Sequence, residues 1–233
     1  MNTQSNLATL CQSLDLPLSE AELQAAFLHS SYVNELPESG LTSNERLEFL
    51  GDAVVDLAVS EYLFDNVPHA EGRLTRIKAV VVSGPTLAAR ARQLQLQDCL
   101  YLGRGEEASG GRQRESILSD TFEALVGVVF THRGYDEAAR FVLDQLEADI
   151  EKALRGEHRR DYKTLLQEQA QRQGLRPVYS LVAAEGADHA KHFTVQVDLN
   201  GETAQGDGRR VKDAEQAAAK RLCQRLEIVA TEV

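Results

Sequence analysis

The stretch NERLEFLGD at residues 44–52 decides the fold expected for this chain of 233 residues. In a helix of about 3.6 residues per turn, Glu45, Glu48 and Asp52 share one face, because residues three and four apart are neighbours. The other residues here and at 53–55 are mostly apolar, as in a buried helix. Like charges at this spacing repel each other, and a buried helix does not carry them without a partner. The stretch therefore predicts a largely buried helix whose carboxylates bind a cation.

A second acidic segment, SDTFEAL at residues 119–125, places Asp120 and Glu123 three residues apart in another apolar helix. Converging carboxylates from both helices favour a hard cation such as Mg²⁺, which takes oxygen ligands. The chain has no Glu-x-x-His pair of the di-iron type and no glycine-rich nucleotide-binding motif. His189 and His192 have zinc-like spacing but no nearby cysteine. We therefore expect Mg²⁺ and no nucleotide cofactor.

Each acidic pair also has a structural explanation. Thr42 and Glu45 have the spacing of a capping box, in which Glu45 only closes the helix N-terminus. Asp120 and Glu123 can be first-turn acids that the helix dipole favours. Asp56 continues the first acidic face by one further turn, and we assign it a structural role because no motif includes it. Together, the two acidic pairs inside apolar helices favour metal binding over these alternatives.

The period of the apolar residues divides the chain into an all-α domain at 1–154, a polar linker at 155–160 and a small α+β domain at 161–229. The helices expected in the first domain cover 4–14, 19–30, 44–66, 72–82, 84–97, 115–131 and 135–154. In the second domain a helix at 162–173 precedes strands at 178–184, 192–199 and around 203–206, and a helix at 212–226. Asn200 and Gly201 predict a tight hairpin between the last two strands. The order of the second domain is therefore α-β-β-β-α.

The formal net charge of −11 lies entirely in the first domain. Residues 1–155 contain 24 acidic and 13 basic side chains, whereas residues 156–233 contain 12 of each. An acidic, metal-binding domain beside a neutral domain with local basic clusters fits these numbers. We find no secretory leader and no apolar run long enough to cross a membrane. The three cysteines are far apart, which argues against disulfides, so we expect a cytoplasmic protein without membrane contact.

These segments resemble bacterial ribonuclease III. Residues 44–56 are similar to the signature helix of that family. Glu71-Gly72, residues 73–78 and residues 115–124 match its other acidic elements in the same order. The α-β-β-β-α unit resembles its double-stranded RNA-binding domain. The resemblance covers nearly the whole chain except roughly the first fifteen and last five residues, and a nine-residue signature is highly specific.

The resemblance implies an endoribonuclease that hydrolyses double-stranded RNA with Mg²⁺, or Mn²⁺ as a substitute. It implies products with 5′-phosphates and short 3′ overhangs, and substrates that include ribosomal RNA precursors and other structured RNAs. The family acts as a homodimer, and Phe49 corresponds to an aromatic residue that packs across its interface. The implied metal ligands are Glu48, Asp52, Asp120 and Glu123, with Asp52 and Glu123 most critical for catalysis and Glu45 and Glu71 auxiliary.

The resemblance also implies RNA contacts in the second domain. Thr164, Gln167 and Gln171 have the i, i+3, i+7 spacing of one helix face. His189 matches a loop that enters the minor groove, where such domains recognise the shape of the duplex and its 2′-hydroxyls. The family usually has two lysines before Ala214, whereas this chain has Val211 and Lys212. Arg209 and Arg210 precede them, so either these arginines replace the lost phosphate contact, or they are simply solvated, or the domain binds RNA weakly.

Two functions are compatible with these sequence features. The first is an active nuclease, and the second is a catalytically inert regulator that binds double-stranded RNA. The acidic set distinguishes them, because an inert domain has no need of it. All six positions are acidic in this chain, which favours the enzyme.

Overall fold

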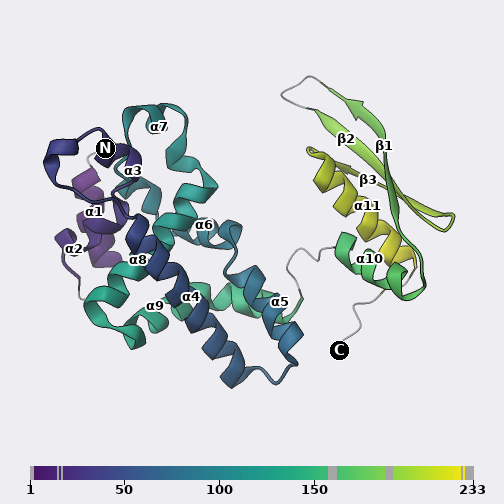
Figure 1. Cartoon of the computed structure of the whole chain (residues 1–233), viewed down its shortest axis with the longest axis horizontal. Helices are drawn as coiled ribbons and strands as arrows, with labels where there is room; N and C mark the ends of the chain where they lie inside the picture. The colour runs from purple at the N-terminus through teal and green to yellow at the C-terminus, as the bar shows by residue number, and fades with distance from the viewer. Residues whose placement is uncertain are drawn as a thin grey trace. The chain divides into compact units, whose positions relative to one another are not determined.

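The computed structural model describes residues 3–14, 16, 18–156, 162–186, 191–226 and 228. The chain folds as two compact units, residues 1–156 and residues 157–233 (Figure 1). Each unit has its own hydrophobic core. The predicted fold class is confirmed: the first unit is helical, and the second combines two helices with a three-stranded sheet.

The first unit consists of α-helices joined by short 3₁₀ segments. In chain order these are α1 (Thr3–Ser13), α2 (Glu20–Gln24), η1 (Ala25–Phe27), α3 (Ser30–Asn34), η2 (Pro37–Ser39), α4 (Glu45–Asn66), α5 (Glu71–Val81), α6 (Gly84–Gln93), η3 (Leu96–Cys99), α7 (Arg104–Ala108), η4 (Gly111–Gln113), α8 (Glu115–Arg133) and α9 (Tyr135–Leu154). Across the described residues, no helix is both long and apolar enough to span a membrane.

The helix predicted at residues 19–30 is wrong in its second half, because the chain there breaks into α2, η1 and α3. Leu28 leaves the helical conformation and forms a bridge with Tyr101. The backbone N–H of Tyr101 donates to the Phe27 carbonyl at 2.9 Å, and that of His29 donates to the Tyr101 carbonyl at 3.2 Å. The His29 ring then caps α3 by accepting from the Ser31 backbone N–H. A long-range backbone contact thus overrides the local helical pattern.

Helix α8 forms the centre of the first core (Figure 1). Its apolar side chains are buried almost all round, and Leu118, Phe122 and Leu125 are fully enclosed. It packs against α4, α6 and α9, and Phe122 stacks on Phe141 of α9 with 6.2 Å between the ring centres. A helix that is buried in this way has no free surface for charges, so its acidic residues must point to a specific place.

Two glycines bring the backbones of α4 and α8 into direct contact. A Cβ atom on Gly51 of α4 would lie 1.8 Å from the carbonyl oxygen of Glu123 in α8. A Cβ atom on Gly127 of α8 would lie 2.2 Å from the carbonyl oxygen of Leu47 in α4. Neither position has room for a side chain, so the two helices cross at closer range than larger residues would allow. This crossing sets the distance between the two acidic segments.

The second unit contains α10 (Tyr162–Arg172), β1 (Val178–Glu185), β2 (His192–Leu199), β3 (Glu202–Gly208) and α11 (Val211–Arg225). The sheet is antiparallel in the order β1-β2-β3, and its core packs against both helices. Asn200 and Gly201 both have positive φ, 55° and 91°, as the predicted two-residue hairpin requires. β3 is longer than predicted. Gly206 lies in it, and a Cβ there would meet the Ala218 nitrogen of α11 at 2.0 Å.

Candidate metal centre and nucleic-acid interface

The crossing of α4 and α8 brings three acidic side chains together. Glu48 of α4 and Asp120 and Glu123 of α8 each offer a carboxylate oxygen, and these oxygens lie within 4.8 Å of one another. All three residues are half-buried. Asp52, one turn after Glu48, is exposed but close enough for its charge to raise the pKa of both Glu48 and Glu123. We call Glu48, Asp52, Asp120 and Glu123 the acidic cluster.

The acidic cluster opposes its own ionisation. Burial, together with the charges of Asp52, Asp120, Glu48 and Asp56, raises the pKa of Glu123 to about 8. Burial and then neighbouring carboxylates also raise the pKa of Glu48, and burial raises that of Asp120. Such a group is stable either protonated or with a cation between its oxygens. The donors are all hard oxygens, so they fit a cation such as Mg²⁺ or Mn²⁺ better than a soft metal.

The structural alternatives for these residues are wrong. Helix α8 begins at Glu115, so Asp120 and Glu123 lie beyond its first turn, where the helix dipole does not account for them. Helix α4 begins at Glu45 itself, and its N-terminal cap is Asn44, whose buried amide donates to the Ala26 carbonyl at 2.9 Å. Glu45 is therefore the first helical residue and cannot be the fourth residue of a capping box.

The two auxiliary acids lie outside the three-residue group. Glu45 is exposed and accepts a hydrogen bond from the Ser43 hydroxyl at 2.7 Å, yet its charge still raises the pKa of Glu48. Glu71 is the exposed first residue of α5, and its carboxylate accepts from the Thr75 hydroxyl at 2.7 Å. Of these two residues, only Glu45 is among the charges that raise the pKa of Glu48.

Without metal, the protein is expected to become less stable relative to Glu123→Gln as the pH rises. Glu123 has a raised pKa in the folded state, so its contribution is fully present below the ordinary value of 4.5 and is lost as the pH passes about 8. The melting temperature of the wild type should therefore fall by about 5 °C relative to the variant across this range. Thermal melts in EDTA between pH 4.5 and 8.5 measure the difference.

Glu147→Gln is the matched control for this experiment, because Glu147 is exposed on α9. Its melting temperature should track that of the wild type at every pH. If the difference in melting temperature between the wild type and Glu123→Gln stays constant with pH, the pKa of Glu123 is not raised by burial and neighbouring carboxylates.

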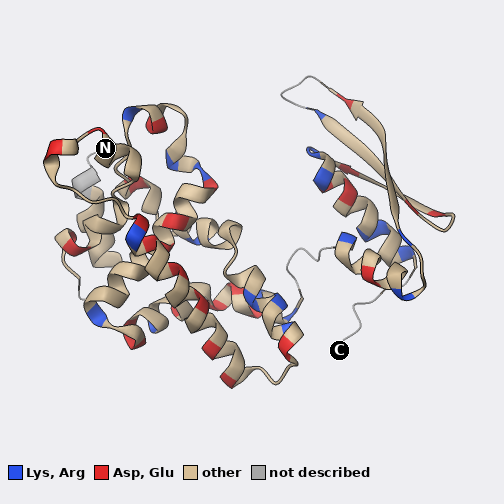
Figure 2. Ribbon diagram, in the orientation of Figure 1, with Lys and Arg blue, Asp and Glu red and all other residues tan. Residues whose placement is uncertain are grey.

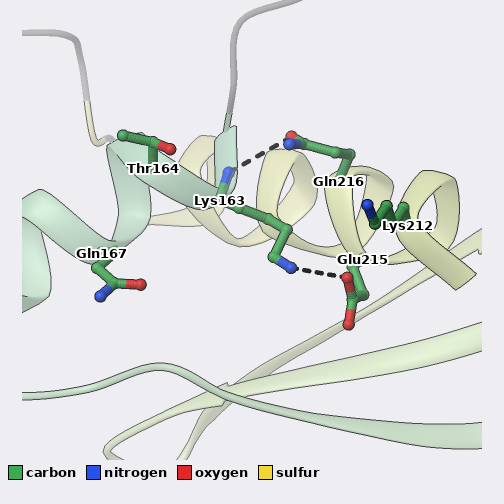
Figure 3. A pocket seen from close by; sticks show the side chains of 6 residues that line it. All are labelled: Lys163, Thr164, Gln167, Lys212, Glu215 and Gln216. Carbon is green, nitrogen blue, oxygen red and sulfur yellow. Dashed lines mark hydrogen bonds and ion pairs between the residues drawn. The ribbon is translucent and has the colours of Figure 1, made fainter.

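In the second unit, the predicted RNA-binding residues Thr164 and Gln167 of α10 and Lys212 of α11 line one pocket of about 290 Å³ (Figure 3). The side chain of Lys163 crosses this pocket and forms an ion pair with Glu215 at 2.7 Å. The ion pair joins α10 to α11 near the starts of both helices. The pocket therefore presents polar groups from two elements side by side.

The remaining predicted contacts lie elsewhere on the second unit or outside the described residues. Gln171 is exposed on α10 and lines a separate depression with Glu168 and Arg172. Arg209 and Arg210 are exposed and precede α11, whose second residue is Lys212; Figure 2 colours the basic residues around the start of this helix blue. His189 lies outside the described residues. The N-terminus of a helix attracts anions, so these arginines are well placed for phosphate.

Comparisons with known proteins match the two units to two different families. Residues 20–150 match a family described as ribonuclease-III-like, and residues 162–226 match the double-stranded RNA binding motif. The chain is 49% identical to ribonuclease 3 of Pelotomaculum thermopropionicum over 205 residues, which are 87% of this chain and 85% of the relative. It is 44% identical to ribonuclease 3 of Fusobacterium nucleatum over 206 residues, 88% of each. A solved structure of the nuclease domain of ribonuclease III from Campylobacter jejuni is also similar, with a TM-score of 0.55 and 37% identity. The match covers 60% of this chain and 95% of that one, and that structure is described as flexible in a region involved in dimer formation.

Proposed function

Because the chain belongs to the ribonuclease III family, we propose that it cuts double-stranded RNA at the acidic cluster with the help of Mg²⁺. The chain is an endoribonuclease of double-stranded RNA, since its relatives are such enzymes and it carries the double-stranded RNA binding motif. The observation that supports the site is the convergence of Glu48, Asp120 and Glu123 within 4.8 Å. An inert RNA-binding regulator would not need this costly group of half-buried like charges.

In the proposed mechanism, Glu48, Asp120 and Glu123 hold the cation, and Asp52 completes the set from the next turn of α4. When bound, Mg²⁺, or Mn²⁺ in its place, supplies an activated water and stabilises charge on the leaving oxygen. Glu45 and Glu71 assist from outside this set. The products carry 5′-phosphates and short 3′ overhangs, and ribosomal RNA precursors are among the substrates.

We place residues 1–154 in the catalytic domain, 155–160 in the linker and 161–229 in the RNA-binding domain. The enzyme is proposed to act in the cytoplasm. All three cysteines, Cys11, Cys99 and Cys223, have free thiols, as suits a reducing compartment.

The proposed function is tested by incubating the purified protein with a long RNA duplex. With Mg²⁺ the duplex should become short fragments with 5′-phosphate ends. With EDTA it should stay intact but bound, and a single strand of the same sequence should survive both conditions. Binding without cleavage in Mg²⁺ and in Mn²⁺ would instead identify the inert regulator.

We further propose a homodimer in which α4 forms part of the interface. Phe49, Leu57 and Phe64 are 80%, 54% and 80% exposed, and they fall within about 80° of one another around the helix. Large exposed apolar side chains in a row are typical of a protein–protein contact. The double change Phe49→Ser/Phe64→Ser should convert a dimer into a monomer at micromolar concentration, as sedimentation velocity would measure.

Leu36→Ser is the control for the dimer experiment, because Leu36 is also exposed, at 41%, but lies outside α4. It should leave the dimer intact. A wild-type protein that sediments as a monomer at micromolar concentration would contradict the proposed assembly.

The basic residues before α11 are proposed to contact RNA phosphates. Each phosphate that a cation neutralises releases counterions, so the double change Arg209→Ala/Arg210→Ala should weaken duplex binding at moderate salt and flatten its salt dependence by about one to two units of slope. Lys212→Ala should lower the slope by about one unit. His189→Ala should weaken binding with less change in slope, because a neutral minor-groove contact displaces few ions. Filter binding over a salt series, in EDTA, measures all three.

Arg225→Ala is the control for the salt series. Arg225 lies at the far end of α11, about 20 Å from its start, and pairs there with Glu202 and the Thr203 carbonyl. Its slope should equal that of the wild type. If the double arginine variant also kept the wild-type slope, Arg209 and Arg210 would be solvated and the missing lysine would not be replaced.

A further inference from the structure

An ion pair lies at the end of the acidic row on α4. The ammonium group of Lys78 in α5 contacts a carboxylate oxygen of Asp56 in α4 at 2.9 Å. Asp56 follows Asp52 by one helical turn, so it continues the face that carries Glu48 and Asp52. Both members of the pair remain partly exposed, with 31% of the Lys78 side chain and 43% of the Asp56 side chain accessible.

The charge of Asp56 reaches the acidic cluster. It is one of the four carboxylates whose charges raise the pKa of Glu123, together with Asp52, Asp120 and Glu48. Yet Asp56 differs from these three, because it has a cation in contact. Within the described parts of the chain, no lysine or arginine forms an ion pair with Glu48, Asp52, Asp120 or Glu123. Lys78 therefore brings a positive charge to the end of an otherwise uncompensated row.

We infer that Lys78 cancels the charge of Asp56 and thereby limits how tightly the acidic cluster holds a divalent cation. This inference rests on the proposed metal centre. With Lys78 in place, a cation is attracted by the four carboxylates of the cluster, while Asp56 adds little net charge. Without Lys78, Asp56 acts as a fifth negative charge and strengthens the attraction. In this role Lys78 acts only through Asp56, by neutralising its charge, and need not touch the metal or the RNA.

Removing the charge of Lys78 and removing the charge of Asp56 should change the Mn²⁺ affinity in opposite directions. A unit charge about 10 Å from a divalent ion in water changes its affinity by about fourfold. Lys78→Met should therefore tighten Mn²⁺ binding by about fourfold, and Asp56→Asn should weaken it by about the same factor. The double variant removes one charge of each sign and should return to within about twofold of the wild type. Lys78→Arg keeps the charge and should also match the wild type.

The measurement is calorimetric titration of the full-length, RNA-free protein with Mn²⁺ at low ionic strength, where charges are least screened. Lys152→Met is the matched control, because Lys152 of α9 also pairs with a carboxylate, Asp149 at 3.8 Å, and Asp149 is not among the charges that act on Glu123. Its Mn²⁺ affinity should not change. Glu123→Gln should lose most of the Mn²⁺ binding in the same titration.

The outcomes separate this inference from the proposed metal centre. If the wild type and Glu123→Gln bind Mn²⁺ equally, the metal centre itself is wrong and the inference falls with it. If the wild type binds through Glu123 but Lys78→Met has unchanged or weaker affinity, only the inference is overturned. A Lys78→Met protein with normal Mn²⁺ affinity and a raised KM for duplex would mean that Lys78 contacts RNA. If Lys78→Met does not fold, Asp56→Asn decides alone, and unchanged Mn²⁺ affinity in it refutes the inference.

Discussion

Replacing Glu123 with alanine is expected to lower the rate of duplex cleavage by a factor of about 10³ or more. Glu123 has the most strongly raised pKa of the acidic cluster, about 8, because it is half-buried and lies near four other carboxylates. A metal ion placed among them relieves this repulsion, so Glu123 should contribute heavily to holding it. Asp52→Ala should have an effect of similar size, although Asp52 is exposed.

The duplex affinity of Glu123→Ala should stay within about twofold of the wild type, since phosphate contacts elsewhere supply most of the binding. Single-turnover cleavage in Mg²⁺ and filter binding in EDTA measure the two properties separately. Glu147→Ala, which removes an exposed carboxylate of α9, is the control and should cleave normally. Near-normal cleavage by Glu123→Ala would refute the assignment of the acidic cluster as the metal centre.

The sequence alone predicted the parts of the fold that depend on local pattern. The apolar period separates a helical unit from an α-β-β-β-α unit, and the hairpin at Asn200 and Gly201 follows from turn chemistry. The placement of Glu48 beside Asp120 and Glu123 is expected for a physical reason, because carboxylates in apolar helices repel one another and need a shared cation to be tolerated there. The first two inferences depend only on neighbouring residues, whereas the third infers a contact between distant segments from their charge.

Features that depend on distant contacts could not be predicted in the same way. The break at Leu28 arises from hydrogen bonds to Tyr101, far along the chain. The sequence assigns Asp56 a structural role, and its spacing places it on the acidic face, but nothing in its local sequence indicates that it pairs with Lys78. In each case the partner comes from another element of the fold, and the periodicity of a segment does not indicate which element that is.

The close contacts of the glycines of α4 and α8 also depend on packing between distant segments. Glycine inside a helix normally costs about 1 kcal/mol relative to alanine, so a change to alanine should stabilise an ordinary helix. At Gly51 the opposite is expected, because a Cβ would lie 1.8 Å from the carbonyl oxygen of Glu123. That oxygen belongs to the backbone of a central helix, so it cannot move aside as a flexible side chain can.

Gly51→Ala should therefore push α4 away from α8, with two consequences. The melting temperature should fall by about 10 °C or more, because the central helix pair no longer packs closely. Cleavage by the protein that remains folded should fall by at least about 10²-fold, because a shift of about 1 Å separates Glu48 from Asp120 and Glu123. Gly105→Ala is the control: Gly105 is also helical, in α7, but nothing lies within 4 Å of its added Cβ. Thermal melts and single-turnover cleavage of both variants measure the contrast, and a Gly51→Ala protein as stable and active as Gly105→Ala would show that the close crossing of α4 and α8 does not set the geometry of the acidic cluster.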